Sequence, residues 1–222
     1  MRYRVFQDRR DAGQALVSEI RRCDLQDPII LGLPRGGIPV AFEVAMALGA
    51  PLDVMIVRKL GAPFQPELAI GAIASGGIRV LNEDVIRMFP EIDDAGIDRI
   101  AAQETEELGR RERQYRGDLP FPDLTGRDVV LVDDGLATGA TMLAAVRAAT
   151  SRHPASTTVA VPTASESAVA KIAPLVDRLI ALETPPDFRA VGLYYMDFAQ
   201  TTDDEVRDLL AAARQHGMHE PP

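Results

Sequence analysis

Two adjacent carboxylates, Asp133 and Asp134, stand directly after the apolar run 129–132. A short turn of small and hydroxyl-bearing residues follows them and leads into the Ala-rich run 142–150. This pattern is typical of a buried strand followed by a helix, whose first N–H groups lack partners and suit a phosphate. Two carboxylates repel phosphate but suit the vicinal hydroxyls of a sugar or a hydrated Mg²⁺. The segment therefore predicts a site for a phosphorylated ribose.

The turn itself supplies the groups that would hold the phosphate. We expect its backbone N–H groups and its two hydroxyls to donate hydrogen bonds to the phosphate oxygens. The residues concerned are Ala137, Thr138, Gly139, Ala140 and Thr141. A P-loop is excluded because it requires a lysine, and no lysine lies between Arg127 and Arg147. The structural alternative is an ordinary strand-to-helix turn in which the two acids only cap the helix.

The stretch from the apolar run to Thr141 resembles the motif with which type I phosphoribosyltransferases bind 5-phosphoribosyl-1-pyrophosphate (PRPP). Both consist of a hydrophobic strand, two acids, two variable residues and a small-Thr-Gly-x-Thr loop. The resemblance implies an α/β fold, a mostly parallel twisted sheet of about five strands flanked by helices, with a small hood. It also implies that Asp133 and Asp134 hold the ribose hydroxyls and Mg²⁺. The implied reaction transfers the phosphoribosyl group to a nitrogenous base and releases pyrophosphate.

A second candidate element is the Gly-rich turn 33–37, which follows another short apolar run. Gly36 and Gly37 allow the backbone to approach an anion closely, and Arg35 adds positive charge. The family has a pyrophosphate-binding loop at this place, often with a cis non-proline peptide. The matching bond in this chain is Pro34–Arg35.

A third candidate element is the cationic pair Arg58 and Lys59, which follows the expected strand 53–57. Cations at the end of a strand suit a leaving pyrophosphate, although an exposed basic pair is the alternative. The Gly/Pro-rich stretch 60–67 comes next, and we expect a mobile loop. In the family, the loop after this strand closes over the reacting centre and excludes water, and 60–67 matches it by position.

Taken together, the three elements are most similar to those of adenine phosphoribosyltransferases. Hypoxanthine-type relatives carry Asp where Ala137 stands, and that Asp is their proposed base. Our candidate for a replacement base is Glu67. Phe188 lies in a stretch similar to the one that stacks on the base in hypoxanthine-type enzymes, and an aromatic face suits a flat heterocycle. Core packing explains the same ring equally well.

Apolar runs and turn signals predict the remaining elements. Strands are expected at 29–33, 53–57, 68–74, 78–81, 129–132, 157–161 and 176–182, with a hairpin turn at Gly76 and Gly77. Helices are expected at 8–23, 38–48, within 82–116, and at 142–150, 165–173 and 206–213. We expect one domain over 1–222, with a helical insertion at 77–125 and a hood segment with a terminal helix at 183–222.

Composition narrows the function classes. The 222 residues carry a net charge of −9, which disfavours nucleic acid as a partner. A single cysteine, no apolar run of roughly 18 residues and no secretory signal favour a cytoplasmic protein without a membrane span. The predicted partners are PRPP and a small acceptor, with a purine in nucleotide salvage favoured, and homodimers are usual in the family. Two alternatives are a non-catalytic nucleotide-sensing regulator on the same fold and a phosphatase or nucleosidase acting on ribose phosphates.

Overall fold

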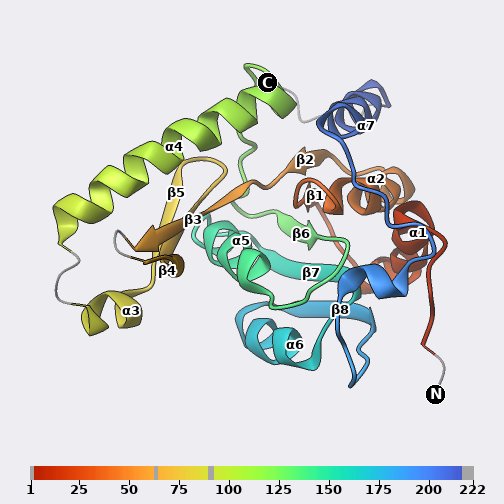
Figure 1. The fold of residues 1–222 in the computed structure, drawn as a ribbon. Helices are drawn as coiled ribbons and strands as arrows, with labels where there is room; N and C mark the ends of the chain where they lie inside the picture. Colours follow the sequence, from red (N-terminus) through yellow and green to blue (C-terminus); the bar gives the residue numbers. More distant parts are fainter. Residues whose placement is uncertain (1–2, 63–64, 90–92, 217–222) are drawn as a thin grey trace.

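The computed structural model describes residues 3–62, 65–89 and 93–216, without the side chains of residues 66 and 67. Its centre is a five-stranded sheet in the order β2-β1-β6-β7-β8, in which every pair of neighbours is parallel (Figure 1). The strands are β1 Pro28–Gly32, β2 Leu52–Val54, β6 Asp128–Val132, β7 Ser156–Thr163 and β8 Arg178–Glu183. The predicted parallel α/β architecture is confirmed.

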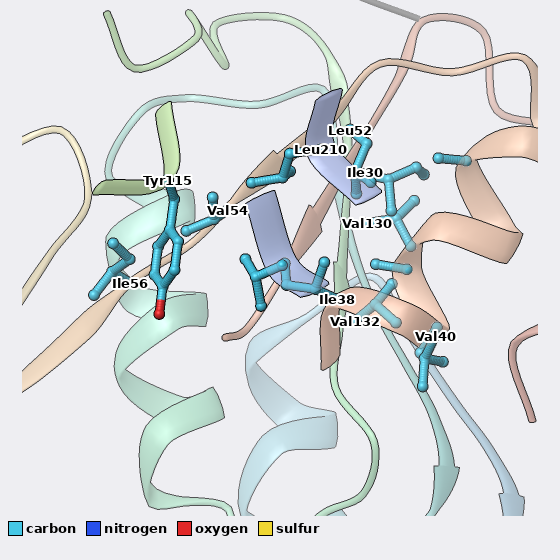
Figure 2. Close-up of a cluster of buried hydrophobic side chains, with 14 of the residues drawn as sticks. Ile30, Ile38, Val40, Leu52, Val54, Ile56, Tyr115, Val130, Val132 and Leu210 are labelled. Carbon is cyan, nitrogen blue, oxygen red and sulfur yellow. The ribbon is translucent and has the colours of Figure 1, made fainter. Parts of the chain in front are cut away.

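Both faces of this sheet are covered, which explains why its strands are continuous apolar runs. Ile30, Val130 and Val132 belong to one core cluster, with residues of α1, α2 and α7. Val129 and Leu131 point to the opposite face and pack with residues of α5 and α6. The helices are α1 Arg9–Ile20, α2 Gly37–Leu48, α5 Ala140–Thr150, α6 Glu166–Ile172 and α7 Asp203–Gln215. Figure 2 shows Leu210 of α7 beside the β1 and β2 side chains of the first cluster.

Three further strands form a separate antiparallel sheet in the order β3-β4-β5. They are β3 Val57–Ala62, β4 Gln65–Ala74 and β5 Ile78–Leu81. Gly76 and Gly77 form the β4–β5 turn with φ values of 79° and 72°, so the expected hairpin is confirmed. The expected mobile loop 60–67 is wrong for its described part, because Leu60 and Ala62 are buried strand residues.

The cationic pair is also placed differently from the prediction. The expected strand 53–57 is split, because β2 ends at Val54 and a new strand, β3, begins at Val57. Arg58 and Lys59 therefore lie inside β3, paired with β4, and not at the carboxyl end of a parallel strand. This stretch forms a strand rather than a strand end because the apolar face of α4 packs on β3 and β4 and buries their apolar residues.

The predicted insertion, 77–125, contains strand β5 as well as helices α3 Glu83–Met88 and α4 Asp94–Arg116. Helix α4 runs from the three-stranded sheet to the C-terminal helix α7 (Figure 1). Its last residue, Arg116, is buried and donates from Nε to both oxygens of Asp53, at 3.1 and 3.0 Å, and from Nη2 to the carbonyl of Val54 at 3.0 Å. This ion pair fastens α4 to β2.

The segment before α1 pairs with the segment around Tyr195, within the stretch 183–222 that was expected to include the hood. The N–H of Phe6 donates to the carbonyl of Tyr194, and the N–H of Met196 donates to that of Phe6, both at 2.8 Å. The short 3₁₀ helices are η1 Arg21–Cys23, η2 Ala173–Leu175 and η3 Val191–Tyr194. Among the described residues, no helix is both long and apolar enough to span a membrane.

Candidate functional site

The acid doublet and the Gly-rich turn are in direct contact, although about a hundred residues separate them in the sequence. The N–H of Leu33 donates to the carbonyl of Val132 at 2.8 Å, which joins the ends of β1 and β6. A Cβ at Gly36 would lie 2.0 Å from Oδ2 of Asp134, and a Cβ at Gly37 would lie 2.7 Å from the carbonyl oxygen of Val132. Only glycine therefore fits this approach, and the first two predicted elements form one site.

Arg9, from the start of α1, holds one oxygen of Asp134. Its Nε and Nη2 lie 2.9 and 2.8 Å from Oδ2, and both side chains are mostly buried, at 12% and 15% exposure. The guanidinium also donates to the carbonyl of Ala199 at 2.7 Å and lies 4.0 Å from the ring centroid of Phe198. Oδ1 of Asp134 has no partner within the described chain, so this oxygen is left for a ligand.

Tyr195 supports the same carboxylate from the hood, since its hydroxyl donates to the backbone carbonyl of Asp134 at 2.6 Å. Sequence reasoning missed both Arg9 and Tyr195. Tyr195 had a weak signal, as it lies in the aromatic stretch around Phe188. Arg9 had none, because a basic residue at the start of a helix is unremarkable.

Asp133 is in an environment that favours its neutral form. Its Oδ1 accepts from the N–H of Asp134 at 2.9 Å. Burial, together with the adjacent carboxylate of Asp134, raises the pKa of Asp133 well above its usual value. Burial also raises the pKa of Asp134, and Arg9 opposes this effect. A bound cation would reverse the balance by favouring the ionised doublet.

The phosphate loop is open to solvent where a ligand would lie. Ala137, Thr138, Ala140 and Thr141 are exposed, and Gly139 adopts φ 72° just before α5. In the described chain, the N–H groups of residues 137–139 have no protein acceptor, and the N–H of Ala140 reaches only the Thr138 hydroxyl at 3.4 Å. These amides are therefore available to an anion.

The loop is held in place from behind by the end of β7. The N–H of Leu136 donates to the carbonyl of Thr163 at 2.9 Å, and Oγ of Ser165 donates to the carbonyl of Ala137 at 2.6 Å. The expected cis peptide at Pro34–Arg35 is present. Arg35 itself is part-exposed, with Nη1 3.9 Å from a carboxylate oxygen of Asp203.

The third element is only partly brought to the site. Nε of Arg58 lies 2.7 Å from Oε2 of Glu104 on α4, so this guanidinium is engaged by a carboxylate. Lys59 and Thr141 line the same mainly apolar cavity of about 280 Å³, between the three-stranded sheet and α5. Lys59 is thus close to the phosphate loop rather than to the Gly-rich turn.

The roles predicted for Glu67 and Phe188 remain predictions. Glu67 belongs to β4 by its backbone, but its side chain lies outside the described part of the structure. Phe188 is half-buried and stacks on Tyr194, with ring centroids 5.4 Å apart and planes at 16°. One face of the Phe188 ring is therefore already covered by protein.

Comparison with known proteins agrees with this geometry. Residues 7–198 match the model of the phosphoribosyl transferase domain family. This chain belongs to that family. As a phosphoribosyl transferase domain, it is 45% identical over 227 aligned positions to two Mycobacterium tuberculosis proteins, each named "Putative phosphoribosyl transferase", MT0597 and Rv0571c. The alignment covers 99% of this chain and 51% of each relative, so the chain spans about half the length of these relatives.

A solved structure is similar over nearly the whole phosphoribosyl transferase domain. The crystal structure of TT1426 from Thermus thermophilus has 45% sequence identity and a TM-score of 0.86. The match covers 95% of this chain and 99% of that chain.

Proposed function

We propose that this domain transfers the 5-phosphoribosyl group of PRPP to a nitrogenous base, with a purine favoured, and releases pyrophosphate. The observation that carries the proposal is the contact between the acid doublet and the Gly-rich turn, beside an open ring of amides. Three kinds of group adjoin one another here. The amides suit a phosphate, the carboxylates suit ribose hydroxyls, and the cationic turn suits a diphosphate. PRPP presents those groups in the same order.

The residues act mainly by positioning and electrostatics. Amides and hydroxyls of residues 137–141 would fix the 5′-phosphate. Asp133 and Oδ1 of Asp134 would accept from the ribose hydroxyls and face the positive charge that grows on the ring as the bond to pyrophosphate breaks. Arg9 holds Asp134 in the required orientation through its other oxygen. Arg35 and the backbone of Gly36 and Gly37 would stabilise the negative charge on the departing group.

The doublet also fits a magnesium ion that enters with the substrate. Among the described residues, no group of three or more His, Cys, Asp or Glu side chains is arranged to hold a metal. Mg²⁺ commonly takes only one or two protein carboxylates and completes its shell with water and substrate phosphates. Asp133 and Asp134 would be those carboxylates, and the ion would neutralise charge on PRPP.

The acceptor and its base belong to the proposal as well. Ala137 has no group that takes a proton, so Glu67 is proposed as the base, and Phe188 as a wall for the flat acceptor. The same proposal places the reaction in the cytoplasm, in nucleotide salvage, with a homodimer as the assembly.

A non-catalytic regulator that senses PRPP or a nucleotide is the second candidate. Two observations favour it: Ala137 cannot act as a base, and Arg9 already occupies Oδ2 of Asp134. Incubation with PRPP, Mg²⁺ and a panel of bases separates the two functions. Base-dependent release of pyrophosphate supports the transferase, whereas tight PRPP binding without release supports the regulator. Release without any base supports a hydrolase.

Thr138→Val tests the phosphate loop without disturbing the core, because Thr138 is exposed. We expect about a tenfold loss of PRPP affinity by calorimetry, or roughly 1.4 kcal/mol, for this variant and for Asp134→Ala. Thr150→Val, at the exposed far end of α5, is the matched control and should bind as the wild type does. Unchanged affinity in Thr138→Val and Asp134→Ala would refute the assignment.

A further inference from the structure

A polar cavity borders the Gly-rich turn at Pro34 and Arg35. Its volume is about 370 Å³, and three guanidinium groups converge on it from two parts of the chain. One comes from the turn after β1 and two come from α4, a helix in the predicted insertion. The lining includes Pro34, Arg35, Arg110, Arg111, Tyr115 and Asp203. A concentration of arginine in a chain of net charge −9 marks a place suited to an anion.

Local packing fixes the α4 arginines beside this turn. Tyr115, one turn after Arg111, is 6% exposed, and its hydroxyl donates to Asp203 at the start of α7. Burial and this hydrogen bond raise the pKa of Tyr115 to about 12, so the hydroxyl stays a donor at neutral pH. Arg116 then locks the helix to Asp53. The end of α4 is thus held rigidly, while the arginine side chains remain solvent-accessible.

Two carboxylates now engage the groups around the cavity: Asp203 lines it, and Glu107 pairs with Arg110 and Arg111 from the same helix. Glu107 accepts hydrogen bonds from Arg110 at 2.7 and 2.8 Å and from Arg111 at 3.0 Å. Arg110 therefore pairs with Glu107 and not with Glu106, the partner that i,i+4 spacing favours. These two guanidinium groups lower the pKa of Glu107 to about 2. Arg110 and Arg111 are 60% and 42% exposed, and ion pairs of such exposure are weak. A ligand with several charged oxygens can therefore replace the carboxylate.

We propose that this cavity receives the pyrophosphate end of PRPP and that Arg110 and Arg111 bind it together with Arg35. The inference rests on the proposed function, because it extends the same ligand beyond Gly36. These parts adjoin one another: the amide loop follows the acid doublet in the sequence, the doublet contacts Gly36, and Arg35 of the same turn lines the cavity. Arginine suits this role because its planar fork pairs with two phosphate oxygens at once. Arg58 is less available for it, since Glu104 engages its guanidinium.

Calorimetry with three probes tests the proposal: inorganic pyrophosphate, PRPP and ribose 5-phosphate, each at one fixed Mg²⁺ concentration. In the double variant Arg110→Ala/Arg111→Ala we expect the affinities for pyrophosphate and for PRPP to fall about tenfold or more. The affinity for ribose 5-phosphate should stay unchanged, because its phosphate binds at residues 137–141. Arg113→Ala is the matched control, since Arg113 is exposed on the same helix and does not line the cavity.

The outcomes separate this inference from the proposed function. If wild type and double variant bind PRPP equally, or if wild type binds no pyrophosphate, the cavity assignment is overturned. An equal loss for ribose 5-phosphate overturns it too, because the damage would not be local. If wild type binds pyrophosphate through these arginines but neither PRPP nor ribose 5-phosphate, the cavity is upheld and the proposed function fails. Arg110→Lys/Arg111→Lys should keep part of the lost affinity, because charge remains without the fork.

Discussion

The two sheets of this molecule reach their folded form by different means. The parallel sheet consists of apolar strands buried on both faces, and its loops at the ends of β1 and β6 carry the acid doublet and the glycines. The antiparallel sheet contains Gly and Pro and has two cations inside β3. It is covered by α4, a mostly charged helix with a narrow apolar face. The first sheet is specified by its own strands, and the second depends on a helix docked from outside.

The same contrast applies to the ligand groups. The parallel sheet carries the residues proposed to bind the ribose and the 5′-phosphate on short loops close to the core, where there is little freedom to move. The α4 region brings longer, exposed side chains to the proposed pyrophosphate cavity. We infer that substitutions in the loops of the parallel sheet weaken the binding of PRPP as a whole. Substitutions in the α4 region should weaken only the binding of its pyrophosphate end.

The largest expected effect concerns the docking of α4. Arg116→Met should lower the free energy of unfolding by about 3–5 kcal/mol, because it leaves the Asp53 carboxylate buried without its partner. Urea unfolding followed by circular dichroism measures this loss. Arg79→Met is the control, since the Arg79–Asp98 pair is exposed at 33% and 69% and should contribute less than about 1 kcal/mol. Similar losses in both variants would mean that apolar contacts alone dock the helix.

Gly36→Ala should mainly affect the ligand site. The backbone at Gly36 has φ −62°, which any residue adopts, so the cost comes from the contact of the new methyl group with Asp134. Such overpacking costs about 1–3 kcal/mol, and we expect PRPP affinity to fall roughly tenfold to a hundredfold.

Calorimetry and thermal melts of Gly36→Ala should be compared with Gly109→Ala, in the middle of α4. The nearest atom to a Cβ at Gly109 is Nη1 of Arg113 at 3.6 Å, so there is room. This control should bind PRPP normally and gain about 0.5–1 kcal/mol of stability, as alanine favours helix. Normal PRPP binding by Gly36→Ala would contradict the contact between turn and doublet.

Asp133→Asn gives the most pH-dependent change. The raised pKa of Asp133 means that, as pH increases above about 4, the unfolded state loses this proton before the folded state does. The ligand-free wild type therefore loses up to about 1.4 kcal/mol per pH unit until the folded-state pKa is passed. Asparagine keeps the acceptor for the N–H of Asp134 and carries no charge.

Thermal melts of wild type and Asp133→Asn across the range from pH 4 to pH 8 measure this difference. The variant should be relatively more stable as pH rises, and it should bind Mg²⁺ and PRPP more weakly. For the wild type, affinity for Mg²⁺ with PRPP should increase with pH, since binding releases the proton. Parallel stability curves for the two proteins would show that Asp133 ionises normally.

Much of the parallel half could be predicted from the sequence because its signals are local. The run 129–132, the two acids and the loop 137–141 are contiguous, and an apolar run between turn signals indicates a buried strand. The Gly-rich turn is equally local, and Gly36 is required there because an added Cβ would lie 2.0 Å from Oδ2 of Asp134. Their contact follows from adjacent parallel strands, whose carboxyl ends share one edge of the sheet.

The remaining parts of the site depend on long-range contacts that no spacing reveals. Arg9 reaches Asp134 over 125 residues of sequence, and Tyr195 reaches it over 61. Arg58 was expected to be available to a ligand, and its pairing with Glu104 needs the placement of α4, which is 46 residues away. The part of β3 from Leu60 onward was expected as a loop because Gly61 and the nearby prolines disfavour strands, and burial under α4 outweighs that preference.

The position of Asp134 between Arg9 and Tyr195 has a consequence for how the protein is made. All strands of the parallel sheet have left the ribosome once residue 183 has emerged, and the loops around the acid doublet are then also present. The hydroxyl of Tyr195 and the carbonyl of Ala199, which fixes Arg9, are still missing. A nascent chain halted at this stage would carry the recognisable motifs with an unsupported carboxylate, and binding competence would arrive with the next sixteen or so residues of synthesis.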